Sequence, residues 1–167
     1  FPAGWNGSAQ VVVLTVTYSG NCGATGNDEN VTWAYYEAAG LLEISGTGAM
    51  ADYGQNKAPW HKQSWTNDIK SIVVNDRVTS IGNNAFMKLT GVTADKIRIA
   101  DTVETIGTGA FANNNITNID FLPDGLKVVW KQSFYGCKSL TTIVLPSKCV
   151  EVGNSAFFGC SNVTQIT

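Results

Sequence analysis

A nine-residue segment recurs four times in the second half of the chain and constrains the fold more than any other feature. Each copy ends in a phenylalanine, and these are spaced 25, 23 and 23 residues apart: Phe86, Phe111, Phe134 and Phe157. A single unit of this length has too little apolar surface to fold alone, whereas stacked units bury a continuous core. The period therefore predicts a solenoid in which the four phenylalanines are buried and stacked in one column.

A short apolar run precedes each copy, at residues 69–74, 97–99, 119–121 and 140–145. Apolar residues alternate with others in these runs, a period typical of a β-strand with one buried face. Each repeat is therefore predicted to contribute one short strand. The four strands, centred near Val73, Arg98, Asp120 and Val144, are expected to be neighbouring rungs of one parallel sheet. A fifth copy starts at Val163.

Charge is sparse and unevenly distributed along the chain. Charged residues make up 14% of the sequence and the formal net charge is −2. Residues 1–56 hold five acids and no Lys or Arg, whereas residues 57–167 hold all eleven bases and eight acids. The change of sign near residue 57 indicates two structural units. The mild positive excess of the second unit argues against nucleic-acid binding, and no apolar run is long enough to predict membrane insertion.

Two sets of motifs resemble the BspA-type leucine-rich repeats of bacterial surface proteins. The repeats carry the letters IGNNAF, IGTGAF and VGNSAF, and the last two continue as YGCKSL and FGCSNV. The upstream segment is similar to the family's amino-terminal module, at Cys22, Trp33, residues 42–50 and Trp60. The resemblance implies an α/β leucine-rich-repeat solenoid, a right-handed superhelix dominated by short strands, with turns, short helical segments and a β-rich cap.

Three segments are expected on this basis. Residues 20–68 form the cap, and residues 69–167 form the solenoid, with four repeats and the start of a fifth. Residues 1–19 match no part of the family. Alternation over residues 11–17 suggests a strand there, which either pairs with the cap or belongs to a preceding domain. The cap is expected to seal the first repeat through apolar contacts toward Ile69 and Ile72, made by Trp33, Leu42, Ile44 and Trp60.

Two features leave alternatives open. Cys137 and Cys160 occupy equivalent positions in successive repeats, where the first two repeats have Leu89 and Asn114. The pair is either buried and reduced or joined in a disulfide, because stacked equivalents can be close without having disulfide geometry. Trp130 replaces the glycine found in the other repeats. It reflects either local repacking or an exposed aromatic contact.

The sequence offers no catalytic constellation. The sole histidine, His61, lies in a predicted surface turn without a neighbouring nucleophile, and most carboxylates fall in turns. No cysteine pair has the CxxC spacing of a zinc site, and the acids at Asp28 and Glu29 lack the spacing of a calcium loop. The chain is therefore predicted not to be an enzyme and to hold neither a metal nor a cofactor.

The predicted function is recognition of a protein or glycan ligand, with host matrix or another surface protein as candidate partners. The resemblance implies adhesion and an extracellular or cell-surface location on a bacterium. A structural spacer that presents another domain is the alternative. Side chains between the core positions should face outward on the concave side and form the binding face: Ser71, Val73, Lys96, Arg98, Asn118, Asp120, Thr142, Val144 and Gln165. The C-terminal edge, at Val163 and Ile166, is expected to be uncovered, which favours self-association.

Overall fold

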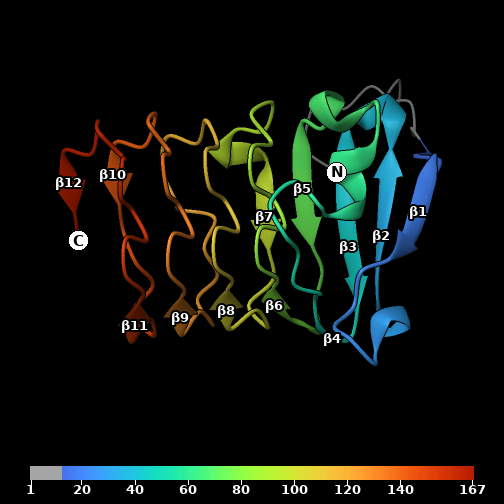
Figure 1. The fold of residues 1–167 in the computed structure, drawn as a ribbon, viewed down its shortest axis with the longest axis horizontal. Coiled ribbons are helices and arrows are strands. Elements are labelled where there is room, and N and C mark those ends of the chain that lie inside the picture. The colour runs from blue at the N-terminus through green and yellow to red at the C-terminus, as the bar shows by residue number, and fades with distance from the viewer. Residues whose placement is uncertain (1–12) are drawn as a thin grey trace, which may run out of the picture.

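The computed structural model describes residues 13–167, which form rows of short β-strands joined by turns (Figure 1). The strands are β1 (Tyr18–Asn21), β2 (Val31–Tyr36), β3 (Leu41–Gly46), β4 (Gly48–Ala49), β5 (Ser71–Val74), β6 (Val78–Ile81), β7 (Ile97–Ile99), β8 (Thr105–Ile106), β9 (Val128–Val129), β10 (Thr142–Ile143), β11 (Glu151–Val152) and β12 (Gln165–Ile166). Short 3-10 helices connect some of them: η1 (Asp28–Asn30), η2 (Glu37–Ala39), η3 (Pro59–Lys62), η4 (Thr66–Asp68) and η5 (Ala94–Lys96). The β-dominated class expected from the sequence is confirmed. Within residues 13–167, no helix is long and apolar enough to cross a lipid bilayer.

The first sheet joins the N-terminal segment to the first repeats in the order β1-β2-β3-β5-β7. Strands β1, β2 and β3 pair antiparallel, whereas β3, β5 and β7 pair parallel. Leu42 is in register with Ile72, which is in register with Ile97, and all three side chains are buried. Side chains therefore alternate along each of these strands: the apolar ones point into the core, and the ones between them point to the outer face of the sheet.

The sheet stops after β7, so the predicted strand at residues 119–121 is wrong. The backbone N–H of Asp120 donates to Asn118 Oδ1 at 3.1 Å, and the N–H of Leu122 donates to the carbonyl of Ile119 at 3.0 Å. The two backbone N–H groups are thus used in local hydrogen bonds of a turn. Such local bonds compete with the hydrogen bonds that would pair this segment with a neighbouring strand. On this side of the stack, parallel pairing resumes only between β10 and β12. The predicted single sheet is therefore two separate pieces.

A second parallel sheet, which the sequence analysis did not predict, runs in the order β11-β9-β8-β6-β4 (bottom row of Figure 1). Apart from β4, its strands come from the recurring segments themselves, with Ile81, Ile106, Val129 and Val152 in register. The prediction of one strand per repeat is thus wrong, because the recurring segments add a second strand. Three of these strands are only two residues long, too short to show a period in the sequence.

The recurring aromatic residues form a stacked column through the core. Ring centroids are 5.5 Å apart from Phe86 to Phe111, 5.5 Å from Phe111 to Phe134 and 5.3 Å from Phe134 to Phe157. The predicted column is confirmed, and the first three rings are fully buried. Phe157 is only partly buried, contrary to the prediction, because no further ring of residues 13–167 stacks on its other side. At the other end, Trp60 extends the column with its ring 5.7 Å from that of Phe86.

Side chains of the following repeats donate hydrogen bonds to the backbone carbonyl groups of the phenylalanines in this column. Cys137 Sγ donates to the carbonyl of Phe111, and Cys160 Sγ donates to that of Phe134, both at 3.2 Å. Asn114, at the same place one repeat earlier, donates its amide to the carbonyl of Phe86 at 2.9 Å. All four cysteines are free, so the reduced alternative holds for this pair. Burial raises the pKa of the Cys137 thiol to about 12.

The N-terminal segment seals the first repeat as expected. Trp33, Leu42, Ile44 and Trp60 are buried in the same core as Ile69 and Ile72. Residues 1–12, with part of the predicted N-terminal strand, lie outside the described residues. Residues 13–17 do not form a strand, and Val13 is 81% exposed. The chain enters the sheet at β1 instead and pairs with β2.

His61, next to Trp60, is expected to make the stability of the protein dependent on pH. Its Nε2 lies 2.7 Å from the carbonyl of Met87, and its buried Nδ1 has no hydrogen-bond partner among residues 13–167. Burial lowers the pKa of His61 from 6.5, nearby Lys88 lowers it further, and the Met87 carbonyl acts in the opposite direction. In the unfolded chain the imidazole takes up a proton at a higher pH than in the folded protein.

Stability should therefore fall as the pH drops through 6.5, because the unfolded state binds more protons in that range. The slope for one proton is no steeper than about 1.4 kcal/mol per pH unit. Urea unfolding between pH 5 and pH 8 measures it, with His61→Phe as the control. An equal slope in wild type and His61→Phe would assign the pH dependence to other groups.

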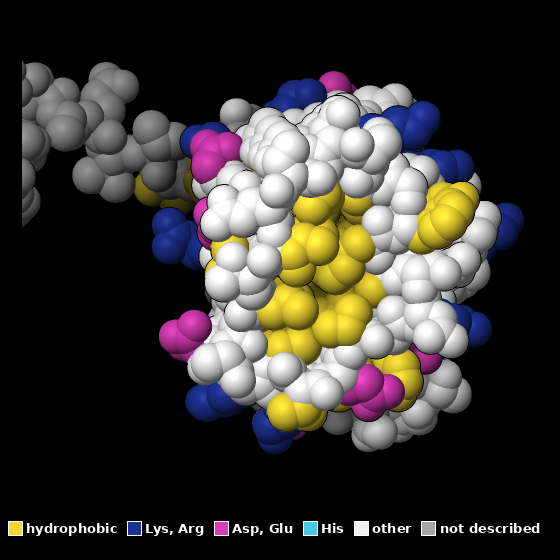
Figure 2. Space-filling model, turned by 90° about the vertical axis from the view of Figure 1, so that its left-hand side faces the viewer, with side chains coloured by type: hydrophobic (Ala, Val, Ile, Leu, Met, Phe, Trp, Pro, Cys, Tyr) yellow, Lys and Arg dark blue, Asp and Glu magenta, His cyan; other side chains and the backbone are white. Residues whose placement is uncertain are grey.

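The C-terminal end of the stack presents apolar side chains at the centre of its face (Figure 2). The last units contribute exposed Val152, Phe158 and Ile166. We expect a consensus repeat added after Thr167 to raise the free energy of unfolding and to reduce self-association, because it covers this face. Calorimetry and light scattering measure the two effects. Unchanged values for both would show that the face needs no cover.

Candidate functional site

The outward side of the first sheet carries a row of side chains in register across four strands. Ala34 on β2 is opposite Glu43 on β3, Glu43 is opposite Val73 on β5, and Val73 is opposite Arg98 on β7. Neighbouring strands are about 4.8 Å apart, so a carboxylate and a guanidinium flank a valine within one row. Two members of this row, Val73 and Arg98, were predicted as binding residues.

Glu43 is held in place by one donor from β2 and one from the turn that follows β5. Its Oε2 accepts the hydroxyl of Tyr36 at 2.7 Å, and its Oε1 accepts the side-chain amide of Asn75 at 2.7 Å. The same amide of Asn75 donates to Ser45 Oγ at 2.9 Å. The Glu43 carboxylate raises the pKa of Tyr36, because it accepts the hydroxyl hydrogen bond. The sequence analysis missed Glu43, although it lies between the buried Leu42 and Ile44 as Val73 lies between Ile72 and Val74.

Arg98 lies beside a hollow of about 350 Å³ at the end of β5 and β7. Val73, Asp76 and Asp101 line the same hollow. Asp101 Oδ1 accepts the backbone N–H of Asp124 at 3.0 Å. Arg98 is exposed and forms no ion pair with any of the residues that the structure describes. Its guanidinium is thus available to an external acceptor.

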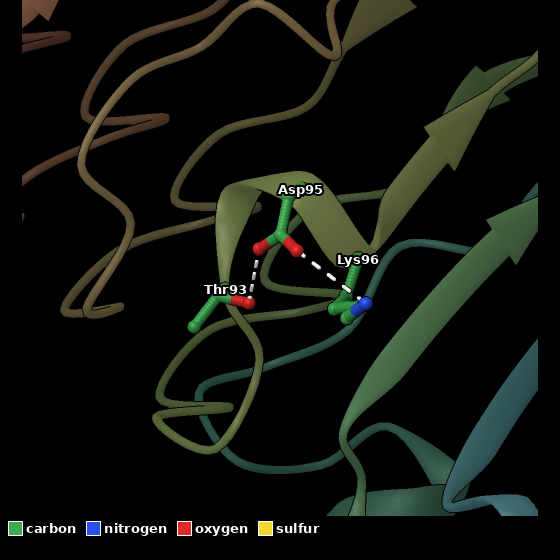
Figure 3. A network of polar contacts seen from close by, with 3 residues as sticks. All are labelled: Thr93, Asp95 and Lys96. Carbon is green, nitrogen blue, oxygen red and sulfur yellow. Dashed lines mark hydrogen bonds and ion pairs between the residues drawn. The ribbon is translucent and has the colours of Figure 1, made fainter.

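Lys96 is placed differently from the prediction, which put it on a strand. It lies in η5, where its ammonium group is 3.4 Å from the carboxylate of Asp95 (Figure 3). Thr93 Oγ1 donates to the same carboxylate at 2.6 Å. The pKa of Asp95 is lowered, first by the hydrogen bond from Thr93 and then by Lys96. Lys96 is therefore a partner of this turn rather than part of the row on the sheet.

The other predicted binding residues fall into separate groups. Ser71 precedes Val73 on β5 and is half-buried. Asn118 and Asp120 line a second hollow of about 340 Å³ together with Asp95. Thr142 on β10 pairs with Gln165 on β12, and Val144 follows β10 and is exposed. The nine predicted residues therefore do not form one continuous strip, because the strand that would link them is a turn.

Metal-binding groups are dispersed through the described part of the chain. Residues 13–167 contain no group of three or more His, Cys, Asp or Glu placed to hold a metal ion. His61 has a backbone carbonyl and not a nucleophile as its hydrogen-bond partner. The arrangement on the first sheet is suited to binding through charge and shape.

A family model for the BspA type leucine-rich repeat region matches residues 63–167 with six copies. The chain belongs to the BspA-type leucine-rich-repeat family. The sequence analysis predicted four repeats and the start of a fifth over residues 69–167, which is nearly the same region. The expected family is thus confirmed, and in this chain the BspA-type repeats supply strands β5 to β12 and the four stacked phenylalanines.

Two solved bacterial proteins share the fold of this BspA-type chain. A leucine-rich repeat protein from Eubacterium ventriosum aligns with a TM-score of 0.65 and 24% identity, over 89% of this chain and 44% of its own. A leucine-rich repeat protein from Bacteroides ovatus aligns with a TM-score of 0.58 and 22% identity, over 75% of this chain and 36% of its own. This chain thus spans less than half the length of either. No curated protein matches the chain.

Proposed function

We propose that this protein is a non-catalytic recognition module that binds a partner protein through the outward face of the first sheet. The observation that carries the proposal is the row of Glu43, Val73 and Arg98, in register on three adjacent strands. Leucine-rich repeats are protein-binding modules in general, which supports a protein as the partner. The family also supports display on the surface of a bacterium or secretion, and it implies a right-handed superhelix.

The row specifies the chemistry of the partner. Arg98 suits a carboxylate, which a guanidinium binds through two parallel hydrogen bonds. Val73 offers an apolar contact between the charges, and Glu43 is fixed by Tyr36 and Asn75. A fixed carboxylate loses little side-chain freedom on binding, which favours a specific contact. The partner surface is therefore one with an acidic group opposite Arg98 and a donor opposite Glu43.

Binding to a panel of purified extracellular-matrix proteins, measured by biolayer interferometry, tests the proposal. Arg98→Ala should weaken any binding found by at least about tenfold, because arginine is prominent among interface residues with large effects. The exposed residue Lys138 provides the control, since Lys138→Ala removes one positive charge away from the first sheet. Equal losses for the two variants would point to general electrostatic attraction.

The structural spacer remains the second candidate, and the same panel distinguishes it. A spacer binds none of the matrix proteins, and Arg98→Ala then changes nothing. Binding that survives both Arg98→Ala and Glu43→Gln would exclude this face as the recognition surface.

A further inference from the structure

At one position of the repeat, three of the four units have a glycine that lies close against the backbone of the preceding unit. At Gly82, an added Cβ would lie 1.8 Å from the carbonyl oxygen of Ala51. At Gly107, the nearest backbone atom would be 2.7 Å away, and at Gly153 it would be 2.4 Å away. Real Cβ atoms do not approach backbone this closely, so a side chain at this position requires a shift in the chain.

Trp130 occupies this position in the third repeat. The backbone ladder is retained, since the N–H of Trp130 donates to the carbonyl of Ile106 at 2.9 Å, as that of Gly107 does to Ile81. Ser133 replaces the alanine of the other repeats, and its hydroxyl donates to the carbonyl of Gly107 at 3.0 Å. The third repeat thus accepts the largest side chain where its neighbours have the smallest. Such local departures from a repeat pattern are expected at functional sites.

Packing in the core does not account for this tryptophan. Its side chain is 44% exposed, and no aromatic ring among residues 13–167 stacks on it. Trp33, Trp60 and Trp65, in contrast, are buried and contact one another or other rings. The indole of Trp130 therefore presents a large apolar surface to the outside.

Two hollows meet at Trp130 on the second sheet, and we call them together the Trp130 groove. The first, of about 400 Å³, is lined by Ser80, Asn83 and Thr105. The second, of about 440 Å³, is lined by Glu151, Asn154 and Lys131. Both share Trp130 and Thr108. The glycines at the equivalent positions of the adjacent repeats, Gly107 and Gly153, line one hollow each and leave this space open.

We propose that the Trp130 groove binds a neutral oligosaccharide, with sugar rings in the hollows against the indole. A pyranose has an apolar face of C–H groups and a rim of hydroxyl groups. The indole suits the apolar face, and the hydroxyl and amide side chains around it suit the rim. This site is separate from the row of Glu43, Val73 and Arg98, which lies on the first sheet.

Charge in the groove decides between neutral and acidic sugars. Asp52 and Glu151 line the two hollows, against Lys131 as the one cation among the lining residues. The Asp52 carboxylate accepts the N–H of Asn83 at 2.8 Å, which fixes it at the edge of the first hollow. An acidic saccharide would meet net negative charge, whereas a neutral one can donate hydroxyl groups to these carboxylates.

Titration with trisaccharides, followed by the indole N–H signals in ¹H–¹⁵N NMR spectra, tests the proposal. The probes are maltotriose, cellotriose and triacetylchitotriose, with trigalacturonate as the acidic comparison. The Trp130 signal is assigned by its absence in Trp130→Gly. We expect at least one neutral trisaccharide to shift the Trp130 signal saturably and trigalacturonate to leave it unchanged.

The variants separate binding from folding. Trp130→Gly restores the residue of the other repeats, so urea unfolding should show an intact fold, while saccharide binding, followed by the remaining signals, falls at least about tenfold. Trp130→Phe keeps an aromatic face and should lose no more than about threefold. Arg98→Ala should bind the saccharide as wild type does, whatever it does to a protein partner.

Three results would overturn the proposal. In the first, no neutral trisaccharide shifts the Trp130 signal. In the second, Trp130→Gly binds the saccharide as tightly as wild type. In the third, only a matrix protein or trigalacturonate binds in a Trp130-dependent way, which would make the indole a protein anchor or the groove an anion site.

Discussion

Phe111→Ala is expected to lower the free energy of unfolding by about 3–5 kcal/mol, the usual range for emptying a buried aromatic site. Phe111 is fully buried, and its ring is packed between those of Phe86 and Phe134. Phe121 contacts it from the side, with ring centroids 5.4 Å apart. Removal of the ring therefore leaves a cavity in the middle of the column, where neighbours on both sides are fixed by their own stacking. Chemical denaturation measures the loss.

Two further phenylalanines of this chain serve as controls. Phe158 is 64% exposed, so Phe158→Ala should change the free energy of unfolding by no more than about 1 kcal/mol. Phe157, stacked on one side only, should give an intermediate loss. A loss below about 1 kcal/mol for Phe111→Ala would contradict the buried column.

Trp60→Ala should destabilise the protein by a similar amount, about 3–5 kcal/mol, because it removes a fully buried ring that joins the N-terminal segment to the repeats. The indole stacks on Phe86 and meets Trp33 edge to face, with centroids 6.3 Å apart. Its Nε1 also donates to the carbonyl of Ala85 at 2.8 Å. The loss is a large part of the total for a domain of this size.

Trp60→Phe separates the ring from its hydrogen bond. Phenylalanine keeps much of the stacking on Phe86 but leaves the Ala85 carbonyl without its donor, at an expected cost of about 1–3 kcal/mol. Thermal unfolding of the two variants should therefore rank Trp60→Phe between wild type and Trp60→Ala. Equal stability of wild type and Trp60→Ala would mean that the two segments fold independently.

The sequence predicted the parts of the fold that repeat and are buried. Phe86, Phe111 and Phe134 recur at spacings of 25 and 23 residues, and stacking lets such short units share a core. Ile72 and Ile97 were likewise recognisable as buried strand positions from alternation. Both inferences depend on apolar periodicity, the signal that burial leaves most directly in a sequence.

Features set by local polar groups were not predictable in the same way. The run at Ile119 has the apolar pattern of a strand, yet the Asn118 side chain and a backbone turn take up its hydrogen-bonding groups. The two-residue strands of the second sheet are too short to show a period. Glu43 was missed because the cap was treated separately from the repeats, whereas β3 and β5 pair directly in one sheet. The effect of Trp130 on the surface depends on its glycine neighbours in space, which lie 23 residues away on either side.

The rung-by-rung pairing has a mechanical consequence. In the second sheet each inner repeat pairs with the repeats before and after it, and on the other side of the stack β12 pairs with β10. Tension applied along the stack would load the few hydrogen bonds between neighbouring repeats and separate the repeats one at a time. Each released unit of 23 residues could extend to a polypeptide roughly 80 Å long. Under tension, such a stack would unfold in small steps, while the repeats that have not yet separated stay folded.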